Sequence, residues 1–223
     1  IGYFWGYKTA GIFQNTQEID EWRAAGNGIL QSNVQPGDVR FVDRNHDGQI
    51  NDKDKVNLGN GTPDFTLGLN LGFVYKGFDF SIVANGAFGQ QIVQSYRNHT
   101  RPTPNYTTAI LDRWHGEGTS NRIPRVTDSN INYQFSDLFI QNGDYLRLST
   151  LTLGYDFAKL FKGKAVSQAR LYFQVQNLFT ITGYDGMDPE IGFGSSNNSW
   201  VSGLDYGYYP RPRTVLVGVN LKF

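Results

Sequence analysis

The sequence contains no cysteine, so neither a disulfide framework nor a thiolate metal site can form. Its 20 basic and 20 acidic residues cancel to a formal net charge of zero, so we expect no nucleic-acid partner, which would require a clustered basic surface. No run of about 18 apolar residues is present, and the sequence therefore predicts no transmembrane helix. The first residues include neither an initiator methionine nor a signal peptide, which leads us to expect a piece of a longer or processed protein.

Aromatic residues and glycine, by contrast, are plentiful. The chain of 223 residues has 16 Phe, 13 Tyr, 4 Trp and 26 Gly, while only 18% of its residues are charged. This composition is typical of a β-protein with many turns and large ring surfaces. The mean hydropathy of −0.43 is compatible with a membrane β-barrel, because the alternating strands of a barrel average out in any hydropathy window.

Alternation of apolar and polar residues predicts long β-strands. From Asp64 to Lys76 one face is almost wholly polar or small, and the other is wholly apolar, consisting of Phe65, Leu67, Leu69, Leu71, Phe73 and Tyr75. A tight turn at Lys76-Gly77 is expected to lead into a returning strand over Phe78–Gln90. The pattern recurs three more times and then once more weakly, in Asp144–Phe157, Gln168–Phe179, the last ten residues and Tyr3–Phe13.

The lengths of the six predicted strands and of their connections favour a membrane barrel over a soluble sandwich. Strands of about ten to fourteen residues can cross a bilayer at a tilt, whereas strands in soluble sheets are mostly about 5–6 residues long. Minimal or short connections, at Lys76-Gly77 and Ala158–Ser167, alternate with the long connections Gln14–Pro63, Gln91–Gly143 and Ile181–Arg213. Outer-membrane barrels have this arrangement, with short periplasmic turns and long extracellular loops. We expect the long connections to be loops rather than domains, with a short helix over Gln17–Ala25.

The strongest local motif resembles the calcium-binding loop of an EF-hand. Carboxylate and amide side chains recur at its odd positions, followed by a glycine where the chain must turn sharply. The predicted ligands are Asp43, Asn45 and Asp47 at positions 1, 3 and 5, the backbone carbonyl of Gln49 at position 7, and Asp54 at position 12. This spacing suits Ca²⁺, a hard cation that takes six to eight oxygen ligands.

The flanks of this motif differ from those of an EF-hand. Val39–Val42 reads as a strand before it and Asn57–Pro63 as a loop after it, so no helix pair is available to open. We therefore expect a structural calcium site rather than a sensor. Because Asp54 is shorter than the usual glutamate, we expect weak binding, of the order of 10⁻⁴–10⁻³ M as in extracellular modules. The alternative is a metal-free run of Asx turns, which use the same residue types.

Segments along nearly the whole chain resemble the SusC/RagA-type TonB-dependent transporters. The first is Gly2–Gln14, similar to a G-x-x-x-G-Y-x-x-x-G-I-F-Q pattern, and the second is Pro36–Asp43, similar to the P-G-D lead-in to a D-x-N-x-D-G loop. Further matching segments follow in the family's order: Leu58–Asn60, Pro63–Phe65, Asp144–Leu148, Val175–Phe179, Tyr184–Glu190 and Tyr209–Arg213.

This resemblance implies an all-β fold in which residues 1–223 form the C-terminal part of a transmembrane antiparallel barrel of about twenty-two strands. It also implies a plug domain, a SusD-like surface lipoprotein as a lid, and uptake of oligosaccharides or peptides driven through TonB at a Bacteroidota outer membrane. The plug and the TonB-binding segment are absent from this sequence. The expected partners are therefore the rest of the barrel and plug, the lipoprotein, TonB through the plug, and outer-membrane lipid.

Two functions from different classes are weighed on this basis. The first is a transporter segment, and the second is a secreted, calcium-stapled β-sandwich that binds glycans. They differ in where the apolar strand faces point, toward lipid in a barrel and toward each other in a sandwich. The three histidines are scattered and no glycine-rich phosphate loop is present, so we expect no enzyme and assign no catalytic residue. The sequence also names no substrate-binding residue.

Overall fold

The structure is a computed structural model that describes residues 2–95, 108–127, 130–158, 166–191 and 202–223. The chain divides into two compact units. The first unit comprises Ile1–Asn60, Val93–Gln141 and Leu204–Tyr206; the second, here called the sheet unit, comprises Gly61–Ile92, Asn142–Gly203 and Gly207–Phe223. Among the described residues, none of the helices combines the length and apolar character required to span a bilayer.

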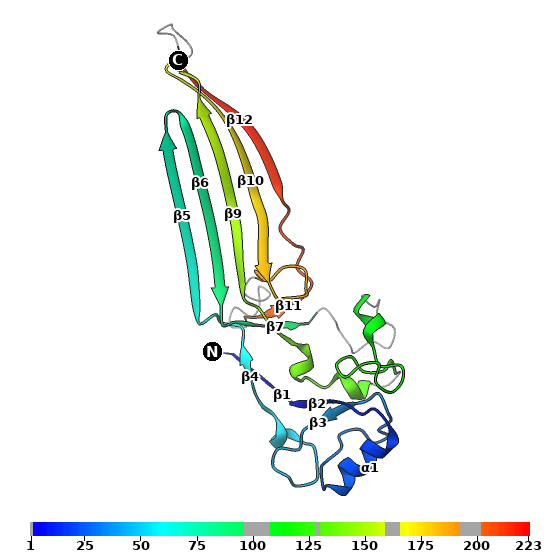
Figure 1. Cartoon of the computed structure of the whole chain (residues 1–223). Helices are drawn as coiled ribbons and strands as arrows, with labels where there is room; N and C mark the ends of the chain where they lie inside the picture. Colours follow the sequence, from blue (N-terminus) through cyan, green and yellow to red (C-terminus); the bar gives the residue numbers. More distant parts are fainter. Residues whose placement is uncertain (1, 96–107, 128–129, 159–165, 192–201) are drawn as a thin grey trace. The chain divides into compact units, whose positions relative to one another are not determined.

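The sheet unit is built on five long antiparallel strands that lie side by side (Figure 1). Their order across the sheet is β12-β10-β9-β6-β5. In chain order they are β5 (Phe65–Tyr75), β6 (Phe78–Phe88), β9 (Tyr145–Asp156), β10 (Gln168–Thr182) and β12 (Thr214–Lys222). All five strands predicted by the stronger alternation are therefore confirmed, with ends that shift by a few residues.

The hairpin between β5 and β6 has the tight turn that the sequence predicts. Lys76 and Gly77 both have positive φ angles, of 48° and 93°. A turn with two successive positive φ angles matches the right-handed twist of the flanking strands. Glycine is preferred in such turns because it adopts a positive φ angle without a steric cost. The short link between β9 and β10 was predicted over Ala158–Ser167, and its residues 159–165 lie outside the described residues.

Register across the sheet sorts the side chains into alternating apolar and polar rows. One apolar row runs over all five strands and contains Phe73, Phe80, Leu153, Phe173 and Val217. Another contains Leu71, Ile82, Leu151, Val175 and Val215. The row between them contains Gly72, Ser81, Thr152, Gln174 and Leu216. Because residues in one row share a face, the sheet has one apolar and one largely polar or small face.

The first unit has its own small core, and its short strands are labelled in Figure 1. Strand β1 (Tyr3–Gly6) pairs with β4 (Val56–Asn60), and β2 (Thr9–Ile12) pairs with β3 (Val39–Phe41). The buried core cluster consists of Tyr7, Val39, Phe41 and Ile50, with Leu30 and Leu138 packed against it. The remaining short elements of the described chain are η1 (Asp52–Asp54), β7 (Gln91–Gln94), η2 (Thr108–Asp112), η3 (Asn130–Tyr133), η4 (Asp137–Phe139), β8 (Ile140–Asn142) and β11 (Leu204–Asp205). Strands β7 and β8 each include residues of both units.

The predicted helix over Gln17–Ala25 is confirmed as α1 (Thr16–Ala24). Asn15 caps it, because its side-chain oxygen accepts a hydrogen bond of 2.9 Å from the backbone N–H of Glu18. Ile19 is the buried residue of this helix, with 3% of its surface exposed.

Three expectations from the sequence are wrong. The sixth strand, Tyr3–Phe13, is split into β1 and β2, which pair with β4 and β3 instead of joining the five-stranded sheet. Asn57–Pro63 is not simply a loop, because Val56–Asn60 forms β4. The long connections are also more than loops, because residues from Gln14–Pro63 and Gln91–Gly143 together form most of one compact unit. Pairings between residues this far apart in sequence leave no local pattern from which they could be predicted.

Candidate functional site

The apolar face of the sheet has no packing partner among the described residues. On β5, the side chains of this apolar face are 42–61% exposed, and Leu69, Leu71 and Phe73 are among them. On β12, Val217 and Val219 are 70% and 61% exposed. Exposed apolar patches of this extent mark interaction or membrane-facing surfaces in proteins. The strands of 11, 11, 12, 15 and 9 residues have the length needed to cross a bilayer at a tilt.

On the polar face, an ion pair between Arg170 and Asp79 reaches across β9, which lies between β10 and β6. Arg170 of β10 donates to Asp79 of β6, with Nε at 2.8 Å from Oδ1 and Nη2 at 2.5 Å from Oδ2. Strand β9 lies between them and has Gly154 at this level. A Cβ at Gly154 would lie 2.3 Å from Asp79 Oδ1 and 2.7 Å from Arg170 Nε, so only glycine leaves room for the pair.

A bulge in β9 changes which residues share a face. The pairing of β9 with β6 steps from Thr150 directly to Leu148, opposite the consecutive residues Val83 and Ala84, so Ser149 is the extra residue. Since side chains alternate between faces, one extra residue reverses the alternation beyond it. Arg147 would share the apolar face with the odd-numbered residues of a regular strand, but the bulge places it on the polar face.

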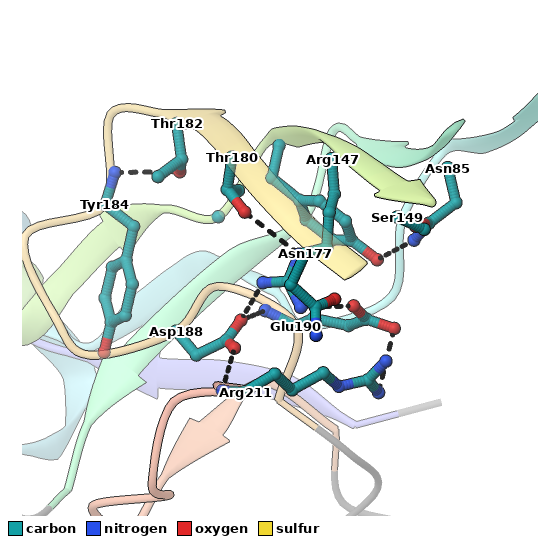
Figure 2. A network of polar contacts seen from close by, with 12 residues as sticks. Asn85, Arg147, Ser149, Asn177, Thr180, Thr182, Tyr184, Asp188, Glu190 and Arg211 are labelled. Atoms are coloured by element: carbon teal, nitrogen blue, oxygen red, sulfur yellow. Dashed lines mark hydrogen bonds and ion pairs between the residues drawn. The ribbon is translucent and has the colours of Figure 1, made fainter. Parts of the chain in front are cut away.

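Arg147 is the centre of a buried charge network, shown in Figure 2. Its side chain is 4% exposed, and Nη2 donates to Asp188 Oδ1 at 2.5 Å. Its Nε donates to Thr180 Oγ1 at 3.0 Å, across the strand pair β9–β10. Its Nη1 lies 3.0 Å from Glu190 Oε2 as an ion pair, although the angle is not that of a hydrogen bond. Glu190 in turn pairs with Arg211 at 3.1 Å.

Asp188 is the main anionic partner in this network. Burial raises the pKa of its carboxyl, but hydrogen bonds from the backbone N–H of Glu190 and from Arg147 outweigh that effect, and the net pKa is lowered from 3.8. The backbone N–H groups of Glu190 and Arg211 donate to its two oxygens at 2.9 and 3.3 Å. Asp188 therefore stays ionised. It holds the segments around Glu190 and Arg211, which are 21 residues apart in the sequence, close to Arg147 near the start of β9.

The network unites three segments whose resemblance to the transporter family was noted separately. Asp144–Leu148 supplies Arg147, Tyr184–Glu190 supplies the two carboxylates, and Tyr209–Arg213 supplies Arg211. Sequence reasoning did not connect them. The available signal was the arginine at an odd position in β9, where regular alternation predicts an apolar residue.

The predicted calcium loop lies in the first unit. Asp43 is 1% exposed, and its Oδ2 accepts hydrogen bonds from the backbone N–H of Gly48 at 2.8 Å and of Gly28 at 3.3 Å. Its Oδ1 is buried and has no hydrogen-bond partner. Asn45 and Asp47 lie on the exposed side of the loop, and Asn45 Nδ2 donates to Asp47 Oδ2 at 2.8 Å. This hydrogen bond from Asn45 is the main cause of a lowered pKa of Asp47.

Asp54 is positioned differently from the other predicted ligands. It is fully buried, and Oδ1 accepts from the backbone N–H of Arg44 at 2.9 Å while Oδ2 accepts from that of Asn51 at 2.8 Å. These bonds close the loop and cap η1. In the part of the chain that the structure describes, no three Asp, Glu, His or Cys side chains converge as a metal-ligand group. Gln49 is exposed, and its backbone N–H donates to Asp47 Oδ1 at 3.0 Å.

Comparison with known proteins places these features in a class. No family model matches the chain. TonB-dependent receptor P3 of Formosa agariphila is 34% identical over 234 residues, a match that covers 100% of this chain and 22% of the receptor. TonB-dependent receptor SusC of Bacteroides thetaiotaomicron is 31% identical over 197 residues, covering 87% of this chain and 18% of SusC. A solved structure of the RagAB peptide transporter is similar over 100% of the chain described here, and the match covers 23% of the transporter chain. The TM-score is 0.70 and the sequence identity is 22%.

The fold thus matches that of a segment of the RagAB peptide transporter. By sequence, the homologues of this chain are TonB-dependent receptors, and SusC is one of them. The chain spans about a fifth of the length of these relatives. The relatives are receptors and transporters, which is consistent with the expectation that the chain is not an enzyme.

Proposed function

We propose that this chain forms part of the barrel wall and the loops of an outer-membrane importer. In this proposal the importer takes up oligosaccharides or peptides, acts together with a SusD-like surface lipoprotein, and is powered by TonB through a plug outside this sequence. The importer role is supported by the relatives, which include SusC and the RagAB peptide transporter.

The observation that carries the proposal is the exposed apolar face of the five-stranded sheet. The two rows that contain Leu71 and Phe73 continue across all five strands without a polar residue. Such a face exposed to water would be a site of aggregation, whereas in a bilayer it meets acyl chains. A β-sandwich would cover this face with a second sheet of similar size, and the other sheets of the described residues have only two or three short strands.

The edges of the sheet support the same reading. Within the described residues β5 pairs only with β6, and β12 pairs only with β10. Open edges do not occur in the hydrocarbon region, because each unpaired N–H and C=O group there costs several kcal/mol. In the proposed barrel both edges pair with strands outside this sequence.

A test of the membrane-facing surface uses neighbouring residues of one strand. The chain has no cysteine, so Leu71→Cys and Asn70→Cys each add one reactive thiol here; any thiol elsewhere in the full receptor is removed first. Both variants are spin-labelled in bilayers and tested for collision with oxygen and with a water-soluble nickel chelate. We expect the label at position 71 to collide mainly with oxygen and the label at position 70 to be shielded from lipid. Frequent collision with the nickel chelate at both positions would show that neither face meets lipid.

The lipoprotein partner needs a separate test. The full receptor is extracted from outer membranes in mild detergent, and its co-purifying proteins are identified by mass spectrometry. We expect a surface lipoprotein in stoichiometric amount. Recovery of the receptor alone under several detergents would refute the paired importer while leaving the barrel wall intact.

A further inference from the structure

We propose that the loop from Asp43 to Asp54 binds one divalent cation, with calcium preferred, and that the cation stabilises the first unit. The proposal is independent of what the receptor transports. It rests on a buried carboxylate oxygen without a partner, on the donor groups around it, and on the position of the loop between two strand pairs.

The carboxylate of Asp43 provides the first argument. Its Oδ2 bond to the backbone N–H of Gly48 directs the group toward the inside of the turn, while Oδ1 is buried with no hydrogen-bond partner. A buried charged oxygen without a partner is costly, and such groups in proteins are paired or coordinate metals. No cationic side chain pairs with Asp43 among the described residues. A bound cation would therefore offset the cost of burying this carboxylate charge.

The neighbouring donors suit an oxygen-rich site. Asn45 and Asp47 follow Asp43 at alternate positions of the same turn. Their oxygens accept hydrogen bonds within the loop, but these bonds are exposed, unlike those of Asp54, so water can replace them when the side chains turn toward the ion. The carbonyl of Gln49 is the next donor in this spacing, and water can complete the shell from the exposed side. Calcium accepts such irregular sets of six to eight oxygens, whereas magnesium requires a near-ideal octahedron.

The role of Asp54 differs from that predicted by the EF-hand pattern. Both of its oxygens accept backbone N–H groups, from Arg44 and Asn51, and it is fully buried. We therefore assign it as the residue that closes the loop rather than as a bidentate ligand. With a ligand set that lacks a bidentate carboxylate, the affinity is expected in the weak range of extracellular modules, about 10⁻⁴–10⁻³ M.

The loop position gives the cation a structural consequence. Strand β3 ends two residues before Asp43, and β4 begins two residues after Asp54. Between them Ile50 packs into the core with Tyr7 and Phe41. A cation that fixes the turn therefore favours both strand pairs and the core at once, so binding is coupled to the folding of this unit.

The test measures hydrogen exchange of the Gly48 amide in the full receptor, purified with any co-purifying partner and stripped by a calcium chelator. Calcium or magnesium is then added back. At a calcium concentration ten times the dissociation constant, we expect the exchange of this amide to slow about elevenfold, because the open state is depleted by the factor 1 + [L]/Kd. Magnesium at the same concentration is expected to give less than half of this protection.

The variants separate ligation from a general charge effect. Asp43→Asn keeps the shape of the buried group, and Asp47→Ala removes an exposed side chain, so that the second variant is decisive if the first unfolds the loop. Both should lose the calcium-dependent protection. Asp52→Asn is the matched control, because Asp52 lies in the same loop, is 89% exposed and forms an ion pair with Lys55 alone among the described residues; it should keep the protection. The proposal is overturned if the wild-type amide does not respond to calcium up to about 10 mM, ten times the weakest expected dissociation constant, if magnesium protects equally, or if Asp47→Ala still responds like the control.

Discussion

Replacing Arg147 by alanine should open the charge network at the end of β9. The substitution leaves Asp188 buried without its guanidinium partner, and its side chain is only 7% exposed. Removing one member of a buried ion pair typically costs about 3–5 kcal/mol. Asp188 keeps its two backbone donors, from Glu190 and Arg211, so we expect the lower end of this range.

The backbone amides of Glu190 and Arg211 are direct reporters of this change. Each donates to an oxygen of Asp188, so each exchanges with solvent when the network opens. A cost of about 3 kcal/mol corresponds to roughly 100-fold faster exchange, because every 1.4 kcal/mol is a factor of ten. The measurement is hydrogen exchange of the full receptor in detergent, with peptides that cover residues 183–191 and 207–213.

Two further variants complete the design. Arg147→Lys keeps the positive charge but loses the planar fork that reaches Asp188 and Thr180 together, so we expect an intermediate acceleration. Arg23→Ala breaks an exposed pair with Asp20, whose side chains are 54% and 69% exposed, and should leave both reporter amides unchanged. If Arg147→Ala accelerated exchange no more than about threefold, well under 1 kcal/mol, the network would not hold these segments, and the reasoning would be refuted.

Three other predictions concern the sheet and the same network. Gly154→Ala should lower stability by about 1–3 kcal/mol in thermal unfolding of the receptor, because its Cβ displaces the ion pair of Asp79; Gly72→Ala, with no atom within 4 Å of its Cβ, should not. Leu71→Arg should cost about 2–4 kcal/mol in unfolding from bilayers if the residue faces the lipid midplane, and a cost below about 1 kcal/mol would contradict that placement. The lowered pKa of Asp188 means that its stabilising effect is complete above pH 3.8 and disappears as the pH falls through the lower folded value. Exchange at residues 183–191 should accelerate in that window, and Asp188→Asn should remove this dependence.

The regular part of the sheet could be predicted from the sequence because its information is local. Phe65 to Tyr75 alternates without interruption, and the structure forms an 11-residue strand over these residues. The turn at Lys76-Gly77 could also be predicted from the sequence, because Lys76 is followed by glycine, the residue best suited to a positive φ angle. In such segments the backbone period and the burial pattern determine the structure together.

Parts of the chain that depend on distant partners could not be predicted in this way. Leu58 and Gly59 carry no strand signal of their own, and β4 exists because it pairs with β1, at least 50 residues earlier. The contact of Arg147 with Asp188 likewise joins residues 41 positions apart. For the loop at Asp43, the spacing predicted the donor types, but it did not reveal that Asp54 is occupied by backbone N–H groups. The bound cation there is a prediction from the spacing and from the buried oxygen of Asp43.

The extra residue Ser149 gives β9 two independent sections. From Thr150 onward the strand follows one phase of alternation and contributes to the long apolar rows; before Ser149 it follows the opposite phase and presents Arg147 to its carboxylates. Sections that differ in phase can vary separately in evolution or in chimaeric receptors, provided that the bulge between them is kept. A graft that exchanged residues 145–148 but deleted Ser149 would turn Arg147 toward the apolar face of the sheet and leave Asp188 without its partner.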